Sequence, residues 1–280
     1  SIVCPTFGEN LKFFFKYQVN FMYFRYFMWN FSGRQNDIQS HGEIDHGNWI
    51  TGLSFIDNAM LGDQTNAPAI MRENKGNNRY FLLPLLLGIL GILWQLGNGK
   101  KGTQSFWITF TLFFMTGIAI VIYLNQTPYQ PRERDYAYAG SFYAFSIWIG
   151  LGILAVIQGL KKFMPKTIAT VLAVILGLGV PTLMAAENWD DHDRSDRYVA
   201  RDFGINYLES CEPNAVIFTN GDNDTFPLWY AQEVEGVRTD IRVCNTSYLQ
   251  TDWYIDQMKR QAYESEPLPI SWNRSDYVQG

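Results

Sequence analysis

The residues best suited to chemistry lie in NQTPYQPRERDYAYAG, residues 125–140, between two long apolar runs. Arg132 and Arg134 stand two residues apart after a proline, and a guanidinium group can hold two phosphate oxygens at once. Three tyrosines add aromatic faces and hydroxyl groups at the level of lipid headgroups: Tyr129, Tyr136 and Tyr138. This segment could therefore bind a lipid phosphate or pyrophosphate. The alternative is a solvated turn in which the Arg-Glu-Arg-Asp charges neutralise one another.

A second polar stretch, NFSGRQNDIQSHGEIDHGNW at residues 30–49, contains side chains of the kinds that ligate metal ions: His41, Glu43, Asp45 and His46. Zinc sites use such residues at characteristic spacings. The spacing here matches none of those patterns, and glycine-rich polar loops often contain these residue types. We therefore predict no metal site.

The stretch NGDNDTF at residues 220–226 places Asp222 and Asp224 between a predicted strand and a predicted helix. Ligands of α/β folds bind at the carboxyl ends of strands, so these carboxylates could hold a cation, a sugar or an acceptor. Aspartates at such positions also serve in turns and helix caps with no ligand. Both interpretations fit the sequence, which has no phosphate-binding glycine loop and no nucleophile-elbow motif.

Four apolar runs predict membrane-spanning helices, which need about 20 residues to cross about 30 Å of hydrocarbon. None has a charged residue in its interior. Pro84 and Pro181 are predicted near helix ends, where a missing amide donor costs least, and glycines in the last two runs would allow close helix contact. The predicted spans are Tyr80–Leu96, Phe106–Leu124, Ser141–Leu160 and Thr167–Ala186.

The run LKFFFKYQVNFMYFRYFMWNF at residues 11–31 is aromatic but polar on two opposite helix faces, through Lys16 and Asn20 on one and Gln18 and Arg25 on the other. An arginine in the middle of a span costs about 2.5–3.5 kcal/mol or more. We predict a helix that lies in the membrane interface or packs on the other helices. Residues 32–79 are predicted to form an ordered extramembrane loop with little regular structure.

The charge of the chain changes sign where the last apolar run ends. Residues 1–186 carry 14 Lys/Arg and 9 Asp/Glu, and residues 187–280 carry 8 and 18, so the net charges are +5 and −10. A change this sharp indicates a boundary between a membrane part and an aqueous part. We predict an extramembrane part at 1–79, a membrane part at 80–186 and a soluble α/β domain, expected to be incomplete, at 187–280.

Alternating strand and helix patterns in the acidic part predict a small parallel sheet. The strands AVIFT and IRVCNTS have the composition of buried strands. Pro227 suits the first turn of a helix, and Thr251 or Asp252 would cap a later one. The predicted strands are 215–219 and 241–247, and the predicted helices are 193–210, a helix that begins at Pro227, and 251–265.

Two cysteines of the acidic part, Cys211 and Cys244, could form a disulfide if this part faces an oxidising space. Two buried thiols fit the sequence as well. The third cysteine, Cys4, adds no spacing typical of a metal site.

Short connections between the apolar runs predict an up-and-down arrangement of hairpins. Positive charges near the cytoplasmic ends of spans would then set the orientation. Five basic residues fall on each side: Lys100, Lys101, Lys161, Lys162 and Lys166 on one, and Arg72, Lys75, Arg79, Arg132 and Arg134 on the other. Charge alone leaves the orientation open.

Long stretches of the chain resemble one family: YQVNFMYFRYFMWNFSGRQNDIQ, NNRYFLLPLLLGILG, GIAIVIYLNQTPYQPRERDYAYAGSFYAF and PNAVIFTNGDNDTFPLWYAQEVEGVRTDIRV. They are similar to large membrane proteins of Bacteroidota that are usually described only by a domain of unknown function. That family is itself similar to the O-mannosyltransferases of the eukaryotic endoplasmic reticulum, which are GT-C glycosyltransferases. The likeness extends over nearly the whole chain.

The resemblance implies a multi-pass enzyme of the bacterial inner membrane, with its C-terminal domain in the periplasm. Such an enzyme would transfer a sugar from a polyprenyl-phosphate donor to Ser or Thr of acceptor proteins. The lipid-linked sugar is then the donor substrate, and we expect no separate cofactor, no metal and no nucleic-acid partner. The family's acidic catalytic loop lies in an upstream stretch with no counterpart here, so we expect an internal piece that is inactive alone.

The resemblance also places residues 1–79, 125–140 and 187–280 outside, on the side of the donor phosphate. Arg132 and Arg134, with Tyr136, would then neutralise the leaving phosphate, and Arg25 and Arg34 are second candidates. The alternative is a non-catalytic membrane scaffold or assembly factor whose acidic domain binds partner proteins. A transporter fits less well, because no charge lies inside the predicted spans.

Overall fold

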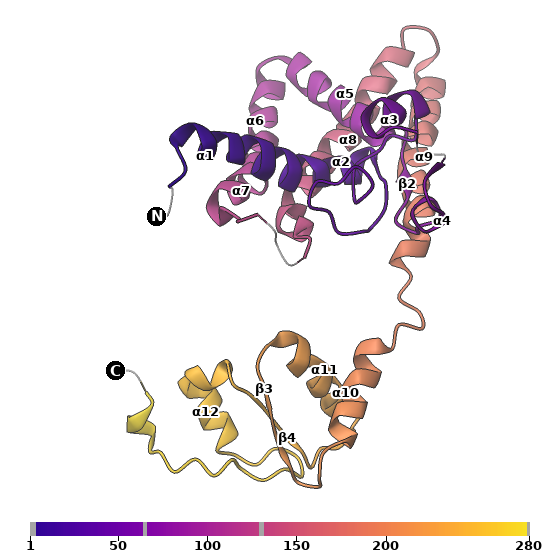
Figure 1. Cartoon of the computed structure of the whole chain (residues 1–280). Helices are drawn as coiled ribbons and strands as arrows, with labels where there is room; N and C mark the ends of the chain where they lie inside the picture. Colours follow the sequence, from indigo (N-terminus) through magenta and orange to yellow (C-terminus); the bar gives the residue numbers. More distant parts are fainter. Residues whose placement is uncertain (1–3, 64–65, 129–131, 279–280) are drawn as a thin grey trace. The chain divides into compact units, whose positions relative to one another are not determined.

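The computed structural model describes residues 4–63, 66–128 and 132–278, which form two compact units, Ser1–Asp193 and Arg194–Gly280. Figure 1 labels their helices and strands. The first unit contains the apolar helices and the polar loops around them. The second is the small α/β unit, and each is described here by itself.

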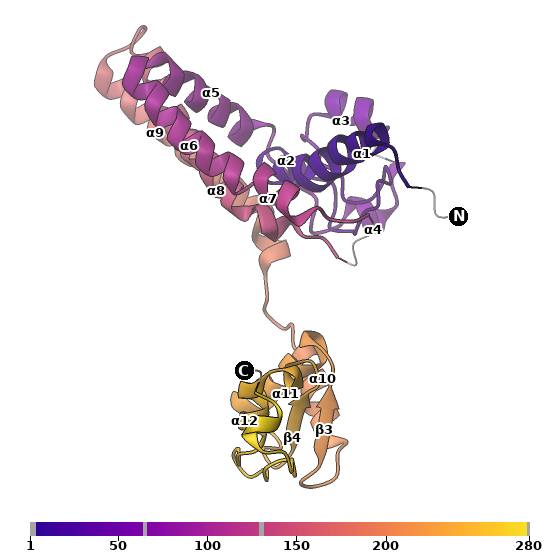
Figure 2. The same ribbon diagram turned by 90° about the vertical axis from the view of Figure 1, so that its left-hand side faces the viewer.

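The first unit is built around a bundle of apolar helices, in which α5, α6, α8 and α9 run side by side (Figure 2). Three helical segments have the length and composition needed to cross a membrane: Gly99–Leu124, Asp135–Leu160 and Lys166–His192. They contain α6 (Gly99–Met115), α7 (Ile118–Leu124), α8 (Ala139–Leu160) and α9 (Lys166–His192). The first unit therefore fits a multi-pass membrane protein.

The first predicted span is shorter than expected. Helix α5 covers Leu83–Gly97, 15 residues, and does not begin at Tyr80. Phe81 and Leu82 adopt left-handed backbone angles, with φ of 53° and 60°, which prevents the helix from starting earlier. At 1.5 Å per residue, α5 is about 22 Å long, less than the roughly 30 Å of a hydrocarbon core. Among the described residues three helical segments have the length of a span, so the predicted count of four is not confirmed.

Pro84 lies in the first turn of α5, as predicted, but the prediction for Pro181 is wrong. Helix α9 continues through Pro181 to His192 and so passes the predicted end at Ala186. Polar contacts hold the turns after the proline: Asp191 accepts from Arg34 at 2.7 Å, and Asn188 accepts from Asn78 at 2.9 Å. These contacts offset the amide hydrogen bond that proline cannot donate.

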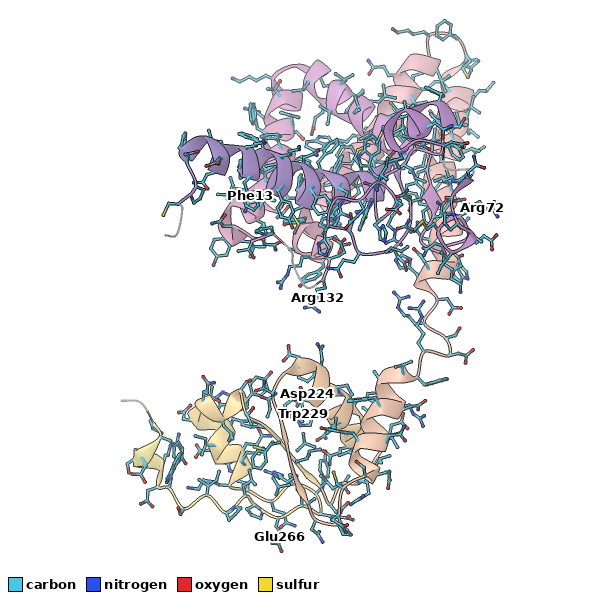
Figure 3. The ribbon with its side chains drawn as sticks, in the orientation of Figure 1. Phe13, Arg72, Arg132, Asp224, Trp229 and Glu266 are labelled. Carbon is cyan, nitrogen blue, oxygen red and sulfur yellow. The ribbon has the colours of Figure 1, made fainter. Side chains whose placement is uncertain are left out.

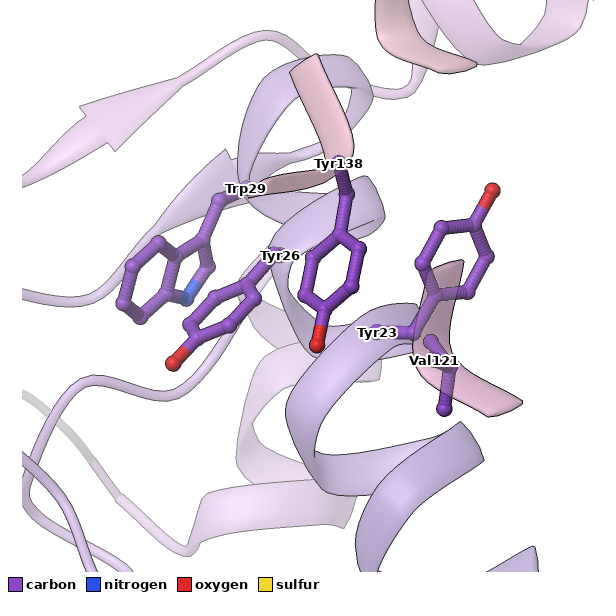
Figure 4. Packing of buried hydrophobic residues seen from close by; sticks show 5 residues of the cluster. All are labelled: Tyr23, Tyr26, Trp29, Val121 and Tyr138. Carbon is purple, nitrogen blue, oxygen red and sulfur yellow. The ribbon is translucent and has the colours of Figure 1, made fainter. Parts of the chain in front are cut away.

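The aromatic run forms one continuous helical segment made of α1 (Phe7–Phe13), the π-helical η1 (Phe14–Phe24) and α2 (Arg25–Phe31). Its C-terminal third packs on the bundle, as one of the two predicted placements requires. Tyr23, Tyr26 and Trp29 form a buried cluster with Val121 and Tyr138 (Figure 4). Phe27 contacts Phe145 with ring centroids 4.9 Å apart.

Between this segment and α5, the chain forms an ordered loop with little regular structure, as predicted. Its elements are α3 (Ser54–Leu61), α4 (Ala69–Arg72) and a two-residue antiparallel pair of β1 (Gly33–Arg34) with β2 (Asn78–Arg79). Buried Asp57 fixes the turn before α3, since its carboxylate accepts from the backbone N–H groups of Thr51 and Gly52 at 2.7 and 2.9 Å.

Polar contacts gather the loops of the first unit at one end of the bundle. Gln18 donates to the side chain of Asn125 at 3.0 Å, and the backbone N–H of Arg79 donates to Glu187 at 2.9 Å. The aromatic segment, the 125–138 loop and the end of α9 therefore lie together. This is the arrangement that the predicted hairpins require.

The second unit has the predicted parallel pair of strands, with Val216 opposite Arg242 in the register. Its core contains Leu208, Leu228 and Ile241. The elements are α10 (Val199–Glu209), β3 (Val216–Thr219), α11 (Asp222–Glu233), β4 (Arg242–Asn245) and α12 (Asp252–Met258), with short 3-10 turns at Tyr248–Gln250 and Arg274–Asp276.

All three helices of this unit differ from the prediction, and α10 begins at Val199 and not at residue 193. Helix α11 begins at Asp222, so Pro227 lies inside it and not in its first turn. The start is earlier because Asp224 accepts the backbone N–H groups of Asn220 and Gly221, which would otherwise be unpaired at the helix N-terminus. Helix α12 ends at Met258, well before residue 265; Thr251 is its N-cap but makes no side-chain capping bond.

Glycines determine how closely α5 and α8 pack. A Cβ on Gly91 would lie 1.8 Å from the carbonyl oxygen of Trp148, and a Cβ on Gly152 would lie 2.0 Å from that of Leu87. The two backbones are in direct contact at these points. Any side chain there must push the helices apart.

We expect Gly152→Ala to lower the stability of the first unit by about 1–3 kcal/mol, the usual cost of overpacking. Gly150→Ala is the matched control, because a Cβ at Gly150, two residues away on the same helix, meets no atom within 4 Å. The measurement is the thermal denaturation midpoint of the full chain in lipid nanodiscs. Equal midpoints for the two variants would contradict the close backbone contact.

Candidate functional site

The 125–138 loop is held in place by a buried ion pair. Arg25, whose side chain is 5% exposed, donates through Nη2 to Oε2 of Glu133 at 2.9 Å. The same guanidinium donates to the carbonyl oxygens of Gly47 at 2.8 Å and Phe21 at 3.1 Å. It also lies 4.0 Å from the ring centroid of Phe21. Arg25 is therefore fully engaged within the protein.

Glu133 accepts hydrogen bonds from two other segments of the chain, α2 and the polar loop that follows it. Besides Arg25, the hydroxyl of Tyr26 and the backbone N–H of Ser40 donate to its carboxylate. Burial raises the pKa of Tyr26 well above its usual value, so this hydroxyl keeps its proton and remains a donor. Removing Glu133 would leave a buried cation without a counter-ion.

Arg34, the other second candidate for the donor phosphate, is also paired. Its Nη2 donates to Asp191 at 2.7 Å, and its Nε donates to the carbonyl oxygen of Gly76 at 3.2 Å. Arg25 and Arg34 thus act as structural residues, each bound to a carboxylate distant in the sequence.

The pairing of Glu133 changes the charge of the loop. The prediction of a self-neutralising Arg-Glu-Arg-Asp turn is wrong for Glu133, whose ion pair crosses to Arg25. Among the described residues, Arg132 and Arg134 have no carboxylate within ion-pair distance. Arg132 is exposed, and its Nη2 lies 3.5 Å from the hydroxyl of Tyr136. The Nε of Arg134 is buried and has no hydrogen-bond partner among the residues that the structure describes.

Of the three predicted loop tyrosines, Tyr136 is exposed beside Arg132, whereas Tyr138 is buried in the aromatic cluster of Figure 4. Tyr129 lies outside the described residues. The structure thus places Arg132 beside Tyr136, and Arg25 fixes their loop through its ion pair with Glu133.

Next to Arg132 lies an open, mostly apolar groove of about 410 Å³ along α1 and η1. Phe13, Tyr17 and Phe21 stack along it with successive ring centroids 5.2 and 5.3 Å apart. Figure 3 shows Phe13 on this helical segment and Arg132 on the loop. Tyr17 and Phe21 also line the small pocket that contains Arg132 and Glu133, so the groove leads to the loop.

The edge of the groove is basic. Lys12, Lys16 and His41 line it together with a single carboxylate, Glu9. Glu9 is used locally, since it accepts the backbone N–H of Thr6 at 2.8 Å and caps α1. An apolar channel with cations at its edge and Arg132 at its end suits an amphiphile with an anionic headgroup.

The groove was not predicted from the sequence, although the sequence contains a signal for it. Phe13, Tyr17, Phe21 and Arg25 recur every four residues, which places them on one helix face. Lys16 is identified in the sequence only as a polar interruption of an aromatic run. Lys12 precedes Lys16 by four residues and so shares its helix face. His41 has no sequence signal, because the loop that contains it folds onto the helix only in three dimensions.

The predicted ligand site in the second unit is a helix cap. Both carboxylate oxygens of Asp224 accept backbone N–H groups, from Asn220 at 2.8 Å and Gly221 at 2.8 Å, and these bonds lower its pKa. Asp222 is exposed in the first turn of α11. The geometry supports the capping alternative for Asp224.

The other polar cluster has local partners as well. Glu43 accepts the backbone N–H of His41 at 2.6 Å, and Asp45 contacts Nδ1 of His46 at 2.7 Å. Within residues 4–63, 66–128 and 132–278, no three His, Cys, Asp or Glu side chains converge on a common point. Cys211 and Cys244 are free thiols, and Cys244 is buried.

Among the described residues, three helical segments are long and apolar enough to cross a membrane, and together with the cationic loop at one end of their bundle they fit a multi-pass membrane protein. Residues 200–280 match the family model of TMEM260-associated domain 2, a domain of unknown function. This match indicates similarity to membrane proteins of the TMEM260 type. Neither a curated protein nor a solved structure matches the chain.

We expect Glu133→Gln to destabilise the first unit by about 3 kcal/mol, the lower end of the cost of breaking a buried ion pair, because Glu133 is partly exposed. Asp135→Asn is the control, a neighbouring carboxylate with no ion-pair partner among the described residues. Thermal denaturation in nanodiscs and protease cleavage within 125–138 measure the effect. If both variants behave alike, Glu133 does not anchor the loop.

Proposed function

We propose that this chain is part of an integral-membrane, GT-C-like glycosyltransferase that moves a sugar from a polyprenyl-phosphate donor to Ser or Thr of a protein. The observation that carries the proposal is the aromatic groove that leads to Arg132, which has no carboxylate partner among the described residues. The resemblance of the sequence to a family similar to O-mannosyltransferases, and the TMEM260-associated domain, support it.

The groove suits the donor in both of its chemical parts. The polyprenyl chain would lie against Phe13, Tyr17 and Phe21, whose stacked rings form an apolar surface. The phosphate would sit where Lys16, Arg132 and Arg134 can reach it. Guanidinium groups are well suited to phosphate oxygens because two parallel N–H bonds can form.

In the transfer, the bond between the anomeric carbon and the phosphate oxygen breaks while the acceptor hydroxyl oxygen bonds to that carbon. Negative charge develops on the leaving phosphate, and Arg132 and Arg134 would stabilise it. The hydroxyl proton passes to a general base. We assign that base to none of the described residues, because the family's acidic loop has no counterpart among them.

The same proposal sets the membrane topology. We place α5 in the bilayer as a fourth, shorter helix, packed on α8 through Gly88, Gly91 and Gly152. The end of the bundle that carries the 125–138 loop would face the periplasm of a bacterial inner membrane. The second unit would then lie on the same side as the donor phosphate and the acceptor protein.

The proposal is tested in the host. Deleting the gene should remove a hexose-sized mass from periplasmic glycoproteins, and the wild-type gene should restore it. We expect the Arg132→Ala/Arg134→Ala double variant to transfer sugar on the order of 10² times more slowly, as when a transition-state donor is removed.

The control for this experiment is Lys161→Ala/Lys162→Ala, which removes two charges from the loop at the opposite end of α8. It should restore the glycan fully. Unchanged glycoprotein masses in the deletion strain would overturn the proposed transferase activity and favour the alternative of a non-catalytic membrane scaffold. Full activity of the arginine variant would overturn the assignment of the phosphate site.

Donor binding has a separate test. We expect Lys12→Ala/Lys16→Ala to weaken binding of undecaprenyl phosphate to the nanodisc-embedded chain by at least about tenfold, because charge-assisted bonds to the headgroup are lost. Lys161→Ala/Lys162→Ala should bind as the wild type does. If both variants bind undecaprenyl phosphate equally well, the groove is not its binding site. If inorganic phosphate binds with the same affinity as undecaprenyl phosphate, the apolar channel has no role in binding.

A further inference from the structure

The second unit contains a cavity of about 350 Å³ between α11, β4 and α12. This volume lies at the lower end of the range of small-molecule sites, about 300–1,000 Å³. The cavity lies within the residues that match TMEM260-associated domain 2. Figure 3 marks Trp229, one of its lining residues, on α11.

Aromatic side chains dominate the walls of the cavity. Trp229 stacks on Tyr248 with ring centroids 6.2 Å apart, and Tyr248 contacts Trp253 at 5.9 Å. Trp253 and Tyr263 are 55% and 60% exposed, although both line a concave site. Large aromatic faces left open to water in a cavity gain free energy when a flat, apolar surface covers them.

Polar groups at fixed positions accompany these rings. The amide of Gln257 is exposed and makes no hydrogen bond to the described residues, so both its donor and acceptor are available. Glu233 lines the cavity as well and accepts a hydrogen bond from the hydroxyl of Tyr263. Tyr263 has a left-handed φ of 52°, a costly conformation for an aromatic residue that places its ring at the cavity.

A buried arginine lines the inner part of the cavity. Arg242 is 4% exposed and has no carboxylate partner among the described residues. Its Nη2 donates to the carbonyl oxygens of Gln257 at 2.8 Å and Arg260 at 2.9 Å, whereas its Nε is buried without any partner. An unpaired buried donor calls for an acceptor that the protein does not supply.

We propose that this cavity binds a neutral saccharide. Sugar rings present flat C–H faces that stack on Trp253 and Tyr263, and hydroxyl groups that can both accept from Gln257 and donate to Glu233. An anionic ligand fits less well, because Glu233 stands at the cavity and residues 187–280 carry a net charge of −10. The inference stands on the second unit and does not depend on the transfer reaction proposed above.

The test uses saturation-transfer NMR on the full chain in nanodiscs free of glycolipid. The probes are methyl α-mannopyranoside, methyl β-glucopyranoside and N-acetylglucosamine. We expect saturation of the ring protons of at least one probe, and a loss of affinity of at least about fivefold in Trp253→Ala, the scale of one aromatic contact.

Trp272→Ala is the matched control, since Trp272 is 59% exposed in the same unit and does not line the cavity. It should bind as the wild type does. Gln257→Ala, a change of an exposed side chain, gives a second test should Trp253→Ala unfold. The inference is overturned by the absence of saturation from every probe, by equal binding of the two tryptophan variants, or by saturation of a Ser/Thr-rich peptide in place of the sugars.

Discussion

The buried ion pair between Arg25 and Glu133 is the interaction on which the polar end of the first unit depends. Arg25 belongs to a helix that is aromatic for most of its length, and its charge would be costly there without compensation. The compensation comes from two carbonyl oxygens, the carboxylate of Glu133 and the face of the Phe21 ring. Because Glu133 also accepts from Tyr26 and Ser40, one carboxylate joins the helix, the polar loop and the 125–138 loop.

This pairing explains why the arginines of the loop are available for a ligand. Once Glu133 is bound to Arg25, Arg132 and Arg134 keep positive charge that no described carboxylate neutralises. Arg132 lies where the groove along Phe13, Tyr17 and Phe21 ends, at the end of the bundle that also holds the polar loops. Positive charge and an apolar channel thus adjoin one another, which is the combination that a lipid phosphate needs.

The two units are held together by different kinds of packing. In the bundle, lipid-facing side chains gain little from association, so contact between α5 and α8 rests on glycines that let backbones touch. The second unit buries a small aliphatic core at Leu208, Leu228 and Ile241, and leaves aromatic rings open around a cavity. Rings that could have been buried and are instead exposed in a concave site indicate a ligand, since burial would have stabilised the fold more.

Local patterns in the sequence determined the long apolar helices and the parallel strand pair, because composition and periodicity depend on near neighbours alone. They also identified Arg132 and Arg134 by their spacing after a proline. Only the tertiary structure decided which arginines are paired, since Glu133 finds Arg25 at a separation of 108 residues. Three further outcomes were decided only by the tertiary structure: α5 is shorter than predicted, α9 continues through Pro181, and Asp224 caps α11. Each of these outcomes depends on contacts or backbone angles that no local pattern encodes.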